Sequence, residues 1–466
     1  MKFTPFSNFF NQEWKQIFAI LTAALVSLNT ALLFAWPSPS IPILVSDEYP
    51  GNITMEQASY ITVIPSISSS ISSPIYPFLM DRLGRKMTLL SVAVPQLISW
   101  LLVAQTTNIY VIYVSRFLSG FSHSSVYATL PVYIGEVASP EVRGLWGNAM
   151  SCCAYLGLCL MNIIGAYFSI PTTAYIFATL PVLFFICFVF MPETPYYYIM
   201  RNELEKAKIS LNKLRRNKNV EKEFLEIKEA VDRQVGESGS ILDLFRVRSN
   251  LKGLLVAIAV RGAQQFAGIS AFAVYAPYLF LEAGSKISAN TSAIIFSSAL
   301  TVCACSGSYF LDKLGRRWSM IISCAGCGLI LISESFYFYF KDMLTEQGVS
   351  LPYFPIVGML IYVPIYSLGL GIIPNLTLGE LFSSNIKGKA LCVLNICFAI
   401  YSSLSTKVFQ LLYSNYGMHA PFLLFACCCL FSTIFAVFCM PETSGKTLEQ
   451  IQQDLKGKPK ETITRF

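Results

Sequence analysis

About twelve apolar runs, each long enough to cross a lipid bilayer, dominate this chain of 466 residues. A membrane-spanning helix needs about 20 mostly apolar residues. Only 13% of the residues are charged, against roughly 25% in ordinary soluble domains. Lipid as the solvent explains that deficit, and in lipid the backbone must satisfy its polar groups within helices. The sequence therefore predicts an all-α membrane protein with twelve transmembrane helices. The expected spans are approximately residues 16–36, 57–80, 87–105, 109–134, 145–167, 172–191, 251–281, 289–311, 318–340, 352–379, 388–413 and 418–440.

A short basic loop between two apolar runs occurs twice. Residues 81–86 read Asp-Arg-Leu-Gly-Arg-Lys, and residues 312–317 read Asp-Lys-Leu-Gly-Arg-Arg. Two further motif pairs recur in the same order, namely a Gly-Glu followed by a basic residue and Gly, and then a Pro-Glu-Thr at the end of each half. An ordered set of repeats in a polytopic chain indicates two similar six-helix halves, and points first to a transporter.

The repeats divide the chain into five parts. We expect a cytoplasmic N-terminus (1–15), an N-terminal six-helix half (16–191), a cytoplasmic helical linker (192–250), a C-terminal six-helix half (251–440) and a cytoplasmic tail (441–466). In the linker, apolar residues recur at helical spacing from Leu204 to Leu214 and from Phe224 to Val231. This pattern predicts amphipathic helices that lie against the bundle, although the same surface could serve as a platform for a partner protein.

The distribution of basic residues indicates which loops face the cytoplasm. Most of the 34 lysines and arginines lie in the termini, the linker and the loops with the basic repeats, whereas the opposite loops contain only Lys286 and Lys341. This asymmetry follows the positive-inside rule. We therefore expect a multi-pass protein of the plasma membrane with both termini in the cytoplasm. Nucleic-acid binding is not needed to explain the net charge of +7, because the basic residues are spread over short loops.

Enzymatic and cofactor chemistry finds little support in the sequence. The 14 cysteines lie almost wholly within apolar runs, where thiols pack as small apolar groups. His123 and His419 are the two histidines, and no Ser/His/acid set or phosphate-binding loop is apparent. We expect no enzyme, no metal and no cofactor. The expected partners are a small neutral solute and membrane lipid, and the chain is expected to function as a monomer.

Taken together, the motifs resemble those of the sugar porter family of the major facilitator superfamily. The resemblance rests on the two basic repeats, Arg116, the Gly-Glu and Pro-Glu-Thr motifs and the Gln-Gln-Phe-Ala-Gly-Ile-Ser sequence at 264–270, and it covers nearly the whole chain. Residues 34–39, Phe-Ala-Trp-Pro-Ser-Pro, resemble the insect facilitated trehalose transporter-like branch. The resemblance implies the major facilitator fold and facilitative transport of a sugar such as trehalose or glucose by alternating access.

In such a family the charged residues at the cytoplasmic ends of the spans would form a gate. Carboxylates and guanidinium groups at helix ends can pair and interact favourably with helix dipoles. The resemblance implies that these pairs close the cytoplasmic side while the binding site opens outward, and simple positive-inside anchoring is the alternative. The expected gate residues are Asp81, Arg82, Arg85, Glu136, Arg143, Glu193, Asp312, Arg316, Arg317, Glu380, Lys387 and Glu442. For Arg116, inside the fourth span, the resemblance suggests a packed structural cation.

A sugar site requires neutral donors and acceptors together with aromatic faces. The resemblance implies that Gln264 and Gln265 hydrogen-bond the sugar, that Gly268 allows the seventh span to bend, and that Tyr275 belongs to an outer gate. The expected substrate-binding residues are Gln264, Gln265, Ser270, Asn375, Ser151, Asn29 and Thr301.

Several of these positions depart from the family pattern. Ser151 stands where a Gln is usual, Ser270 where an Asn is usual, Asn375 in place of a Trp, and Phe398-Ala399 in place of an Asn-Trp pair. Each lost hydrogen bond to a bound hydroxyl is worth about 0.5–1.5 kcal/mol, so the affinity for a glucose-like ligand would fall unless other groups compensate. A transporter-fold sugar sensor, or a carrier of another neutral solute, therefore remain alternatives.

Two further expectations concern coupling and modification. Proton symporters of the family generally place an Asp in the first span, where this chain has Asn29, which does not titrate. This favours a uniporter. Glu334, in the ninth span, is expected to reach the outer surface or to be paired, with a role as proton carrier as the alternative. Asn52 and Asn290 begin Asn-X-Ser/Thr sequons in loops expected outside, and are predicted glycan acceptors.

Overall fold

The described part of the chain consists of helices joined by turns and irregular segments, without a strand, in a computed structural model. The structure describes residues 6–139, 142, 146, 149–215, 220–236, 241–284, 286–347, 351–382, 384–443, 450 and 451.

The helices fall into three groups along the chain. The first group consists of α1 (Phe6–Ala35), α2 (Pro37–Leu44), α3 (Met55–Ser72), α4 (Ile75–Leu83), α5 (Arg85–Gln105), α6 (Ile109–Val137), α8 (Ala149–Tyr167) and α9 (Ile170–Phe188). The second consists of α10 (Pro195–Met200), α11 (Leu204–Leu214), α12 (Val220–Gly236) and α13 (Asp243–Arg246). The third consists of α14 (Arg248–Phe266), α15 (Ile269–Glu282), α16 (Ala289–Leu314), α17 (Arg316–Glu346), α18 (Phe354–Leu368), α19 (Ile373–Glu380), α20 (Ser384–Tyr416) and α21 (His419–Cys439).

Ten helical segments among the described residues are long and apolar enough to cross a membrane. The predicted second span corresponds to α3 followed by α4, and the predicted fourth span to α6. These two complete the expected set of twelve. Pro37, Pro39 and Pro42 follow directly after α1 and start or lie within α2, so the first span is longer than the predicted 16–36.

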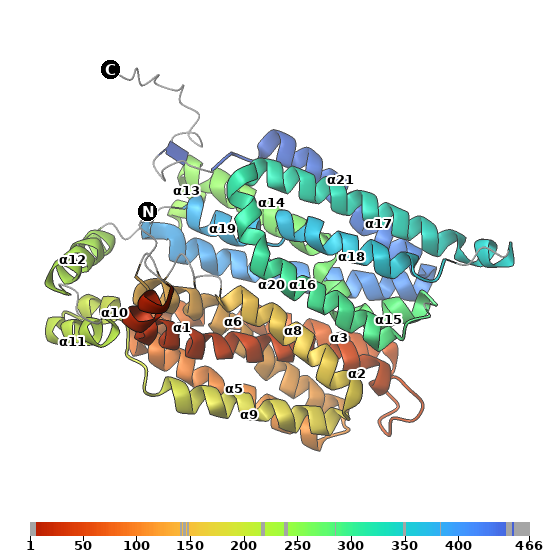
Figure 1. Cartoon of the computed structure of the whole chain (residues 1–466), viewed down its shortest axis with the longest axis horizontal. Coiled ribbons are helices and arrows are strands. Elements are labelled where there is room, and N and C mark those ends of the chain that lie inside the picture. The colour runs from red at the N-terminus through yellow and green to blue at the C-terminus, as the bar shows by residue number, and fades with distance from the viewer. Residues whose placement is uncertain are drawn as a thin grey trace.

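The two six-helix halves lie side by side, as Figure 1 shows, with the N-terminal half in red to yellow and the C-terminal half in green to blue. They meet where α3 packs against α20, where α8 packs against α16 and where α2 packs against α15. The linker helices α10, α11 and α12 lie at one end of the molecule, beside the start of α1. The space between the halves is therefore lined by helices from both.

Two spans of the C-terminal half are broken, where the sequence predicted continuous runs at 251–281 and 352–379. The break between α14 and α15 is at Gly268, whose φ of 92° is unfavourable for other residues and whose added Cβ would lie 2.7 Å from the Phe272 ring. The break between α18 and α19 begins at Gly369, where a Cβ would overlap the Ser319 carbonyl oxygen. Both breaks place backbone and side chains of two helices at the centre of the molecule.

The linker helices are amphipathic, as predicted. Helix α11 covers the predicted segment from Leu204 to Leu214, and α12 covers the second. Their apolar faces form one small core with α10, in which Ala207, Leu211 and Phe224 are nearly or fully buried. Burial of these apolar faces holds α10, α11 and α12 together as a unit at the end of the bundle.

Candidate functional site

Polar side chains gather at the break between α14 and α15. The Gln264 amide donates to the Leu370 carbonyl oxygen at 3.0 Å and accepts from Arg261 Nη1 at 3.0 Å. Arg261 Nη1 also donates to Asn375 Oδ1 at 2.9 Å, and the guanidinium lies 5.3 Å from the centre of the Phe398 ring. One buried arginine therefore connects α14, α19 and α20.

A second hydrogen-bonded chain runs along the other side of the same break. Ser270 donates to Gln265 Oε1 at 2.5 Å, and Ser402 donates to Ser270 at 3.1 Å. Ser405 donates to the Gln265 backbone oxygen at 3.0 Å. The side-chain amides of the two glutamines thus take part in internal hydrogen bonds.

A small cavity of about 20 Å³ adjoins this cluster between the two halves. It is lined by Phe34, Pro65, Ser66, Ser69, His123, Phe398, Ala399 and Ser402. The His123 ring stacks on Tyr127 at 4.4 Å and on Phe398 at 6.0 Å. Ligand pockets typically measure roughly 300–1,000 Å³, so this cavity alone is too small to hold a sugar.

Four of the seven predicted substrate-binding residues lie together in this cluster, namely Gln264, Gln265, Ser270 and Asn375. Asn29 lies elsewhere: its amide donates to Gln96 at 2.8 Å and accepts from Trp100 at 2.9 Å, within the N-terminal half.

The other two predicted residues lie where the halves meet or nearby. Thr301 donates to the Tyr155 carbonyl oxygen at 3.0 Å, where α16 packs on α8. Ser151 is half-buried on α8. Neither contacts the glutamine pair through a hydrogen bond between described residues.

Arg261 and His123 are the residues that sequence reasoning missed. Arg261 is 6% exposed and lies one helical turn before Gln264. The signal was present, because an ionisable residue inside an apolar run is by default a candidate functional residue. Its partners Asn375 and Phe398 come from distant parts of the chain, so their proximity was not visible.

The two halves are joined at the end of the bundle opposite the linker helices. The ring of Tyr275, predicted to belong to an outer gate, is 1% exposed and stacks on Phe409 at 5.2 Å. Lys407 on α20 donates to Ser59 on α3 at 2.7 Å, and its ammonium lies 4.7 Å from the centre of the Tyr60 ring. The contact between α2 and α15 lies at the same end. These contacts hold the two halves together at the end of the bundle opposite the linker helices.

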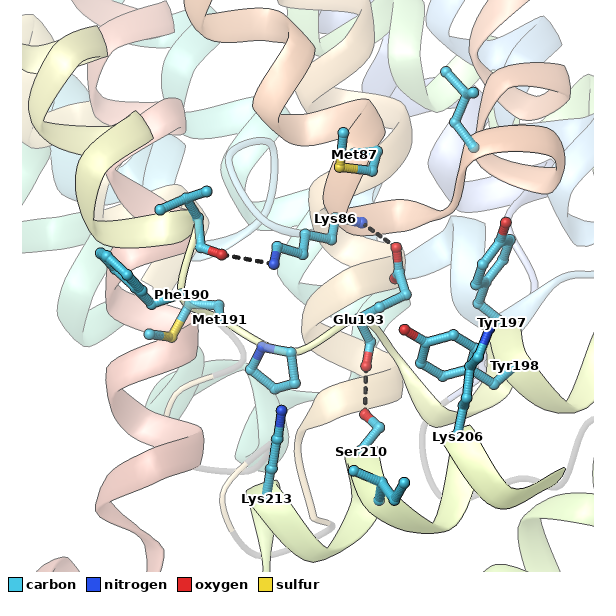
Figure 2. A pocket seen from close by; sticks show the side chains of 14 residues that line it. Lys86, Met87, Phe190, Met191, Glu193, Tyr197, Tyr198, Lys206, Ser210 and Lys213 are labelled. Atoms are coloured by element: carbon cyan, nitrogen blue, oxygen red, sulfur yellow. Dashed lines mark hydrogen bonds between the residues drawn. The ribbon is translucent and has the colours of Figure 1, made fainter. Parts of the chain in front are cut away.

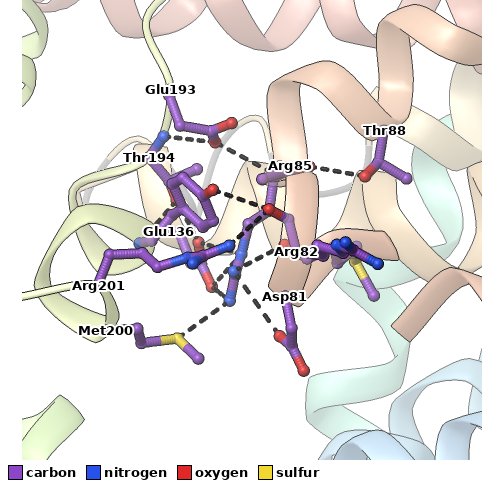
Figure 3. Close-up of polar contacts among 12 residues, drawn as sticks. Asp81, Arg82, Arg85, Thr88, Glu136, Glu193, Thr194, Met200 and Arg201 are labelled. Atoms are coloured by element: carbon purple, nitrogen blue, oxygen red, sulfur yellow. Dashed lines mark hydrogen bonds and ion pairs between the residues drawn. The ribbon is translucent and has the colours of Figure 1, made fainter. Parts of the chain in front are cut away.

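At the opposite end, Arg85 and Glu136 form a shielded ion pair. Arg85 Nε lies 3.1 Å from Glu136 Oε2, and the side chains are 7% and 14% exposed. Thr194 also donates to Glu136 at 2.6 Å. Asp81 lies at the limit of ion-pair distance from Arg85, 4.0 Å, and is 66% exposed. Figure 3 shows how these residues converge around the Arg85 guanidinium.

The Pro-Glu-Thr glutamates accept hydrogen bonds from backbone N–H groups at helix starts. Glu193 accepts from the backbone N–H groups of Arg85 at 3.2 Å and Lys86 at 2.9 Å, at the start of α5. Glu442 accepts in the same way from Arg316 at 3.0 Å and Arg317 at 3.1 Å, at the start of α17. A carboxylate there satisfies free N–H groups and complements the helix dipole.

The glycines of the two basic repeats make this capping possible. Gly84 has a φ of 92° and Gly315 a φ of 80°. A Cβ at Gly84 would overlap the Glu193 carboxylate, and one at Gly315 would lie 3.0 Å from Glu442 Oε2. Burial raises the pKa of Glu193, and its backbone hydrogen bonds partly oppose that rise.

Arg85 on α5 and Glu136 on α6 form an inter-helical pair of the kind that was expected, and the gating role of these residues stays a prediction. The described ion pair of Arg85 and the glutamate caps each lie within one half, rather than between halves. The Arg82 side chain forms no ion pair with a described residue and lies 6.0 Å from the centre of the Phe78 ring, while its carbonyl oxygen accepts from Arg201. Arg143 and the side chains of Asp312, Glu380 and Lys387 lie outside the described residues.

A pocket of about 490 Å³ separates the linker from this region, and Figure 2 shows its walls. Glu193 forms part of the wall, and the Ser210 hydroxyl on α11 donates to the Glu193 carbonyl oxygen. Lys86, at the start of α5, donates to the Val189 carbonyl oxygen at 2.7 Å. The linker helices are thus attached to the same residue that caps α5.

Arg116 is a packed cation, as the resemblance suggested. It is 1% exposed, and it donates to the carbonyl oxygens of Ile61 at 3.1 Å and Leu33 at 2.6 Å. Its guanidinium lies 5.6 Å from the centre of the Trp36 ring. Arg116 therefore ties α1 and α3 to α6.

The expectation for Glu334 was wrong. The side chain neither reaches the surface nor pairs: it is 0% exposed, and neither carboxyl oxygen has a hydrogen-bond partner among the described residues. It packs against Gly358 on α18, where an added Cβ would overlap Oε1. The close approach of α17 and α18 at this glycine encloses the carboxyl group.

Comparison with known proteins agrees with this architecture. The model of the family described as "Sugar (and other) transporter" matches residues 10–455. The chain belongs to this family. It is 32% identical to the facilitated trehalose transporter Tret1-2 homolog of Drosophila simulans over 459 residues, which cover 97% of this chain and 93% of the relative. It is also 32% identical to the facilitated trehalose transporter Tret1 of Aedes aegypti, but spans only 56% of that protein. The relatives are transporters, in agreement with the prediction that this family member is not an enzyme.

Solved structures with the same fold include the major facilitator superfamily proton:xylose symporter XylE. The structure bound to 6-bromo-6-deoxy-D-glucose has a TM-score of 0.73 and 21% identity, with 95% of this chain and 98% of that chain covered. The inward-open structure of XylE from E. coli has a TM-score of 0.76 and 20% identity, with 94% and 98% covered. At this identity the likeness shows the fold alone, which confirms the predicted major facilitator architecture.

Proposed function

We propose that the chain is a facilitative transporter that moves a sugar across the plasma membrane by alternating access. The observation that carries the proposal is the cluster of Gln264, Gln265, Ser270 and Asn375 at the break between α14 and α15. It offers amide and hydroxyl groups at the centre of a membrane bundle, close to where the two halves meet. Trehalose and glucose are the first solutes to test, because the relatives are named for trehalose transport.

The mechanism follows from where the two halves are joined. The outer ends meet through Lys407 and Ser59 and through the packing of α2 on α15, and the cytoplasmic ends contain glutamate caps on α5 and α17. Opening the outer side breaks a few polar contacts that water can replace. The glycine breaks at Gly268 and Gly369 supply points at which α15 and α19 can tilt. Such a two-state arrangement is what alternating access requires.

Uniport is proposed because the first span lacks a titratable group at the relevant place. Asn29 occupies the position suggested for a proton-binding carboxylate, and both ends of its amide are bound by Gln96 and Trp100. Transport would then depend on the sugar gradient alone. We further propose that both termini are cytoplasmic. Asn52 and Asn290, which are exposed at the opposite end, would then be available to carry glycans.

Uptake of radiolabelled trehalose and glucose into oocytes that express the chain tests the proposal. We expect saturable uptake that follows the gradient and does not change with external pH. Gln265→Ala should reduce it strongly, since it removes a predicted sugar contact, with cell-surface biotinylation as the control for expression. The absence of uptake for every sugar, with binding retained, would instead favour a transporter-fold sensor.

A further inference from the structure

Arg261 brings a positive charge into the proposed transport site without a counter-charge. Among the described residues, no carboxylate lies within ion-pair distance of it, and its contacts are two amide oxygens and the face of Phe398. An arginine stays protonated in proteins. Burying an unpaired charge costs several kcal/mol, and a ring face together with two neutral acceptors compensates only part of that cost. The site therefore favours an anion.

One edge of the Arg261 guanidinium is free. Nη1 makes both hydrogen bonds, whereas Nε is buried and has no partner, and Nη2 bonds to no described residue. Nε and Nη2 together form an edge with two parallel N–H groups. That edge matches the two oxygens of a carboxylate, which guanidinium groups bind in a bidentate manner.

The surroundings of this edge are suited to a ligand rather than to structure alone. Asn375, which holds Nη1, is itself exposed, so the cluster adjoins accessible space. The stacked rings of His123, Tyr127 and Phe398 come from both halves and line one side. Gln265 and Ser270 lie within the same helix break. A carboxylate at Arg261 would leave the rest of a ligand against amides, hydroxyls and aromatic faces.

We propose that the solute is a sugar acid, with its carboxylate on Nε and Nη2 of Arg261 and its hydroxyl groups on Gln264, Gln265 and Ser270. The sugar part of this inference rests on the proposed transport function, whereas the carboxylate part rests on Arg261. A hexuronate has the required chemistry, because it differs from a hexose only in a carboxylate at C6.

Ligand binding to the purified full-length protein in detergent tests the inference. D-glucuronate, its neutral amide and D-glucose form a matched series in which only the C6 group changes. We expect the wild type to bind glucuronate at least about tenfold more tightly than the amide or glucose, since hydrogen bonds to charged groups are the stronger class. In Arg261→Gln this preference should disappear, and in Arg261→Lys part of it should remain.

The control is Arg248→Gln, which removes the same charge from the exposed start of the same helix. It should keep the preference for glucuronate. A merely structural Arg261 would give a different result: Arg261→Gln would lower the melting temperature of the ligand-free protein and leave the ratio of affinities unchanged. Tighter binding of glucose 6-phosphate than of glucuronate would assign the free edge to phosphate and overturn the carboxylate assignment.

Uptake measurements separate this inference from the proposed function. If glucose or trehalose is transported and glucuronate binds no better than its amide, transport stands and the acid site is wrong. If glucuronate binds in an Arg261-dependent manner and no solute is transported, the acid site stands and the transport proposal fails.

Discussion

Arg116 and Arg261 are both buried within apolar helices, but the two halves surround them differently. Arg116 in the N-terminal half donates from Nε and Nη1 to backbone carbonyl oxygens of two neighbouring helices. Arg261 in the C-terminal half bonds through Nη1 alone, to side-chain amides beside two helix breaks. Backbone carbonyls cannot move without moving a helix, whereas amides can rotate. The first arginine is a fixed support, and the second is available to a ligand.

The same contrast extends to the amides of the two halves. Asn29 in the N-terminal half is held at both ends by Gln96 and Trp100. Gln265 is held by the hydroxyl of Ser270, across the break at Gly268. Arg116 and Asn29 of the N-terminal half are thus held by fixed partners, while Arg261 and Gln265 of the C-terminal half lie beside points where the backbone can bend.

Replacement of the two arginines is the strongest way to test this contrast. Arg116→Leu leaves two buried carbonyl oxygens without donors, which should cost about 3 kcal/mol and remove most of the protein from the cell surface. Arg261→Leu should lower the stability far less. Its buried charge is compensated only in part, so removing the charge also removes a free-energy cost of folding. Thermal unfolding in detergent and surface biotinylation would measure both. An equal loss of stability in the two variants would break the comparison.

The glycines of the two basic repeats give the next largest effect. Gly84→Ala should destabilise the protein by about 3 kcal/mol, since it combines a positive φ with an overlap on Glu193. Gly315→Ala should cost about 1–2 kcal/mol, because the Glu442 carboxylate is farther away. Gly135→Ala is the matched control, since a Cβ there meets no atom within 4 Å. Melting temperatures give the loss of stability in each variant. A larger loss in Gly315→Ala than in Gly84→Ala would contradict the argument from overlap with the glutamate.

Arg85 and Arg82 compare a buried and an exposed cation within one repeat. Arg85→Gln leaves the Glu136 carboxylate buried without its cation, so transport normalised to surface protein should fall about tenfold, equivalent to ~1.4 kcal/mol. Arg82→Gln should stay within about threefold of the wild type, because exposed charges contribute little. Equal losses in uptake would indicate that both cations act in one gate.

Lys407 joins the two halves at the outer end, and its replacement should have the smallest effect of the substitutions considered. Lys407→Gln removes the ammonium from the Tyr60 ring and weakens the bond to Ser59, which together are worth about 1 kcal/mol. The population with an open outer side should rise about fivefold. Hydrogen–deuterium exchange at the outer ends of α3 and α20 would measure the change in this population. Unchanged exchange would show that Lys407 does not help to hold the outer side closed.

Much of the fold follows from the sequence, because the length of each apolar run and the spacing in α11 depend on local chemistry. The helix breaks were harder to predict from the sequence. Gly268 was expected to permit bending, but the break at Gly369 depends on a close approach to Ser319 from another helix. A one-dimensional pattern contains no information on that distance.

The candidate site likewise contains residues that could be predicted from the sequence and residues that could not. The adjacent glutamines could be identified from the sequence because two amides are unusual in an apolar helix. In the structure they lie at the centre of the molecule. Asn29 looked equally polar, but Gln96 and Trp100 come from a different span and take up both ends of its amide. Glu193 could be placed at the end of the sixth span, whereas its role as a backbone cap depends on the φ of Gly84. Where a partner lies far along the chain, residue type alone did not identify it.

The hydrogen bond from Ser270 to Gln265 has a consequence for turnover. A solute hydroxyl that donates to Gln265 Oε1 in place of Ser270 exchanges one hydrogen bond for another of similar strength. Exchange of this kind adds little net affinity, and it lets the protein restore its own bond as the solute leaves. A carrier built in this way would saturate only at high solute concentrations, and would release its cargo quickly on the far side.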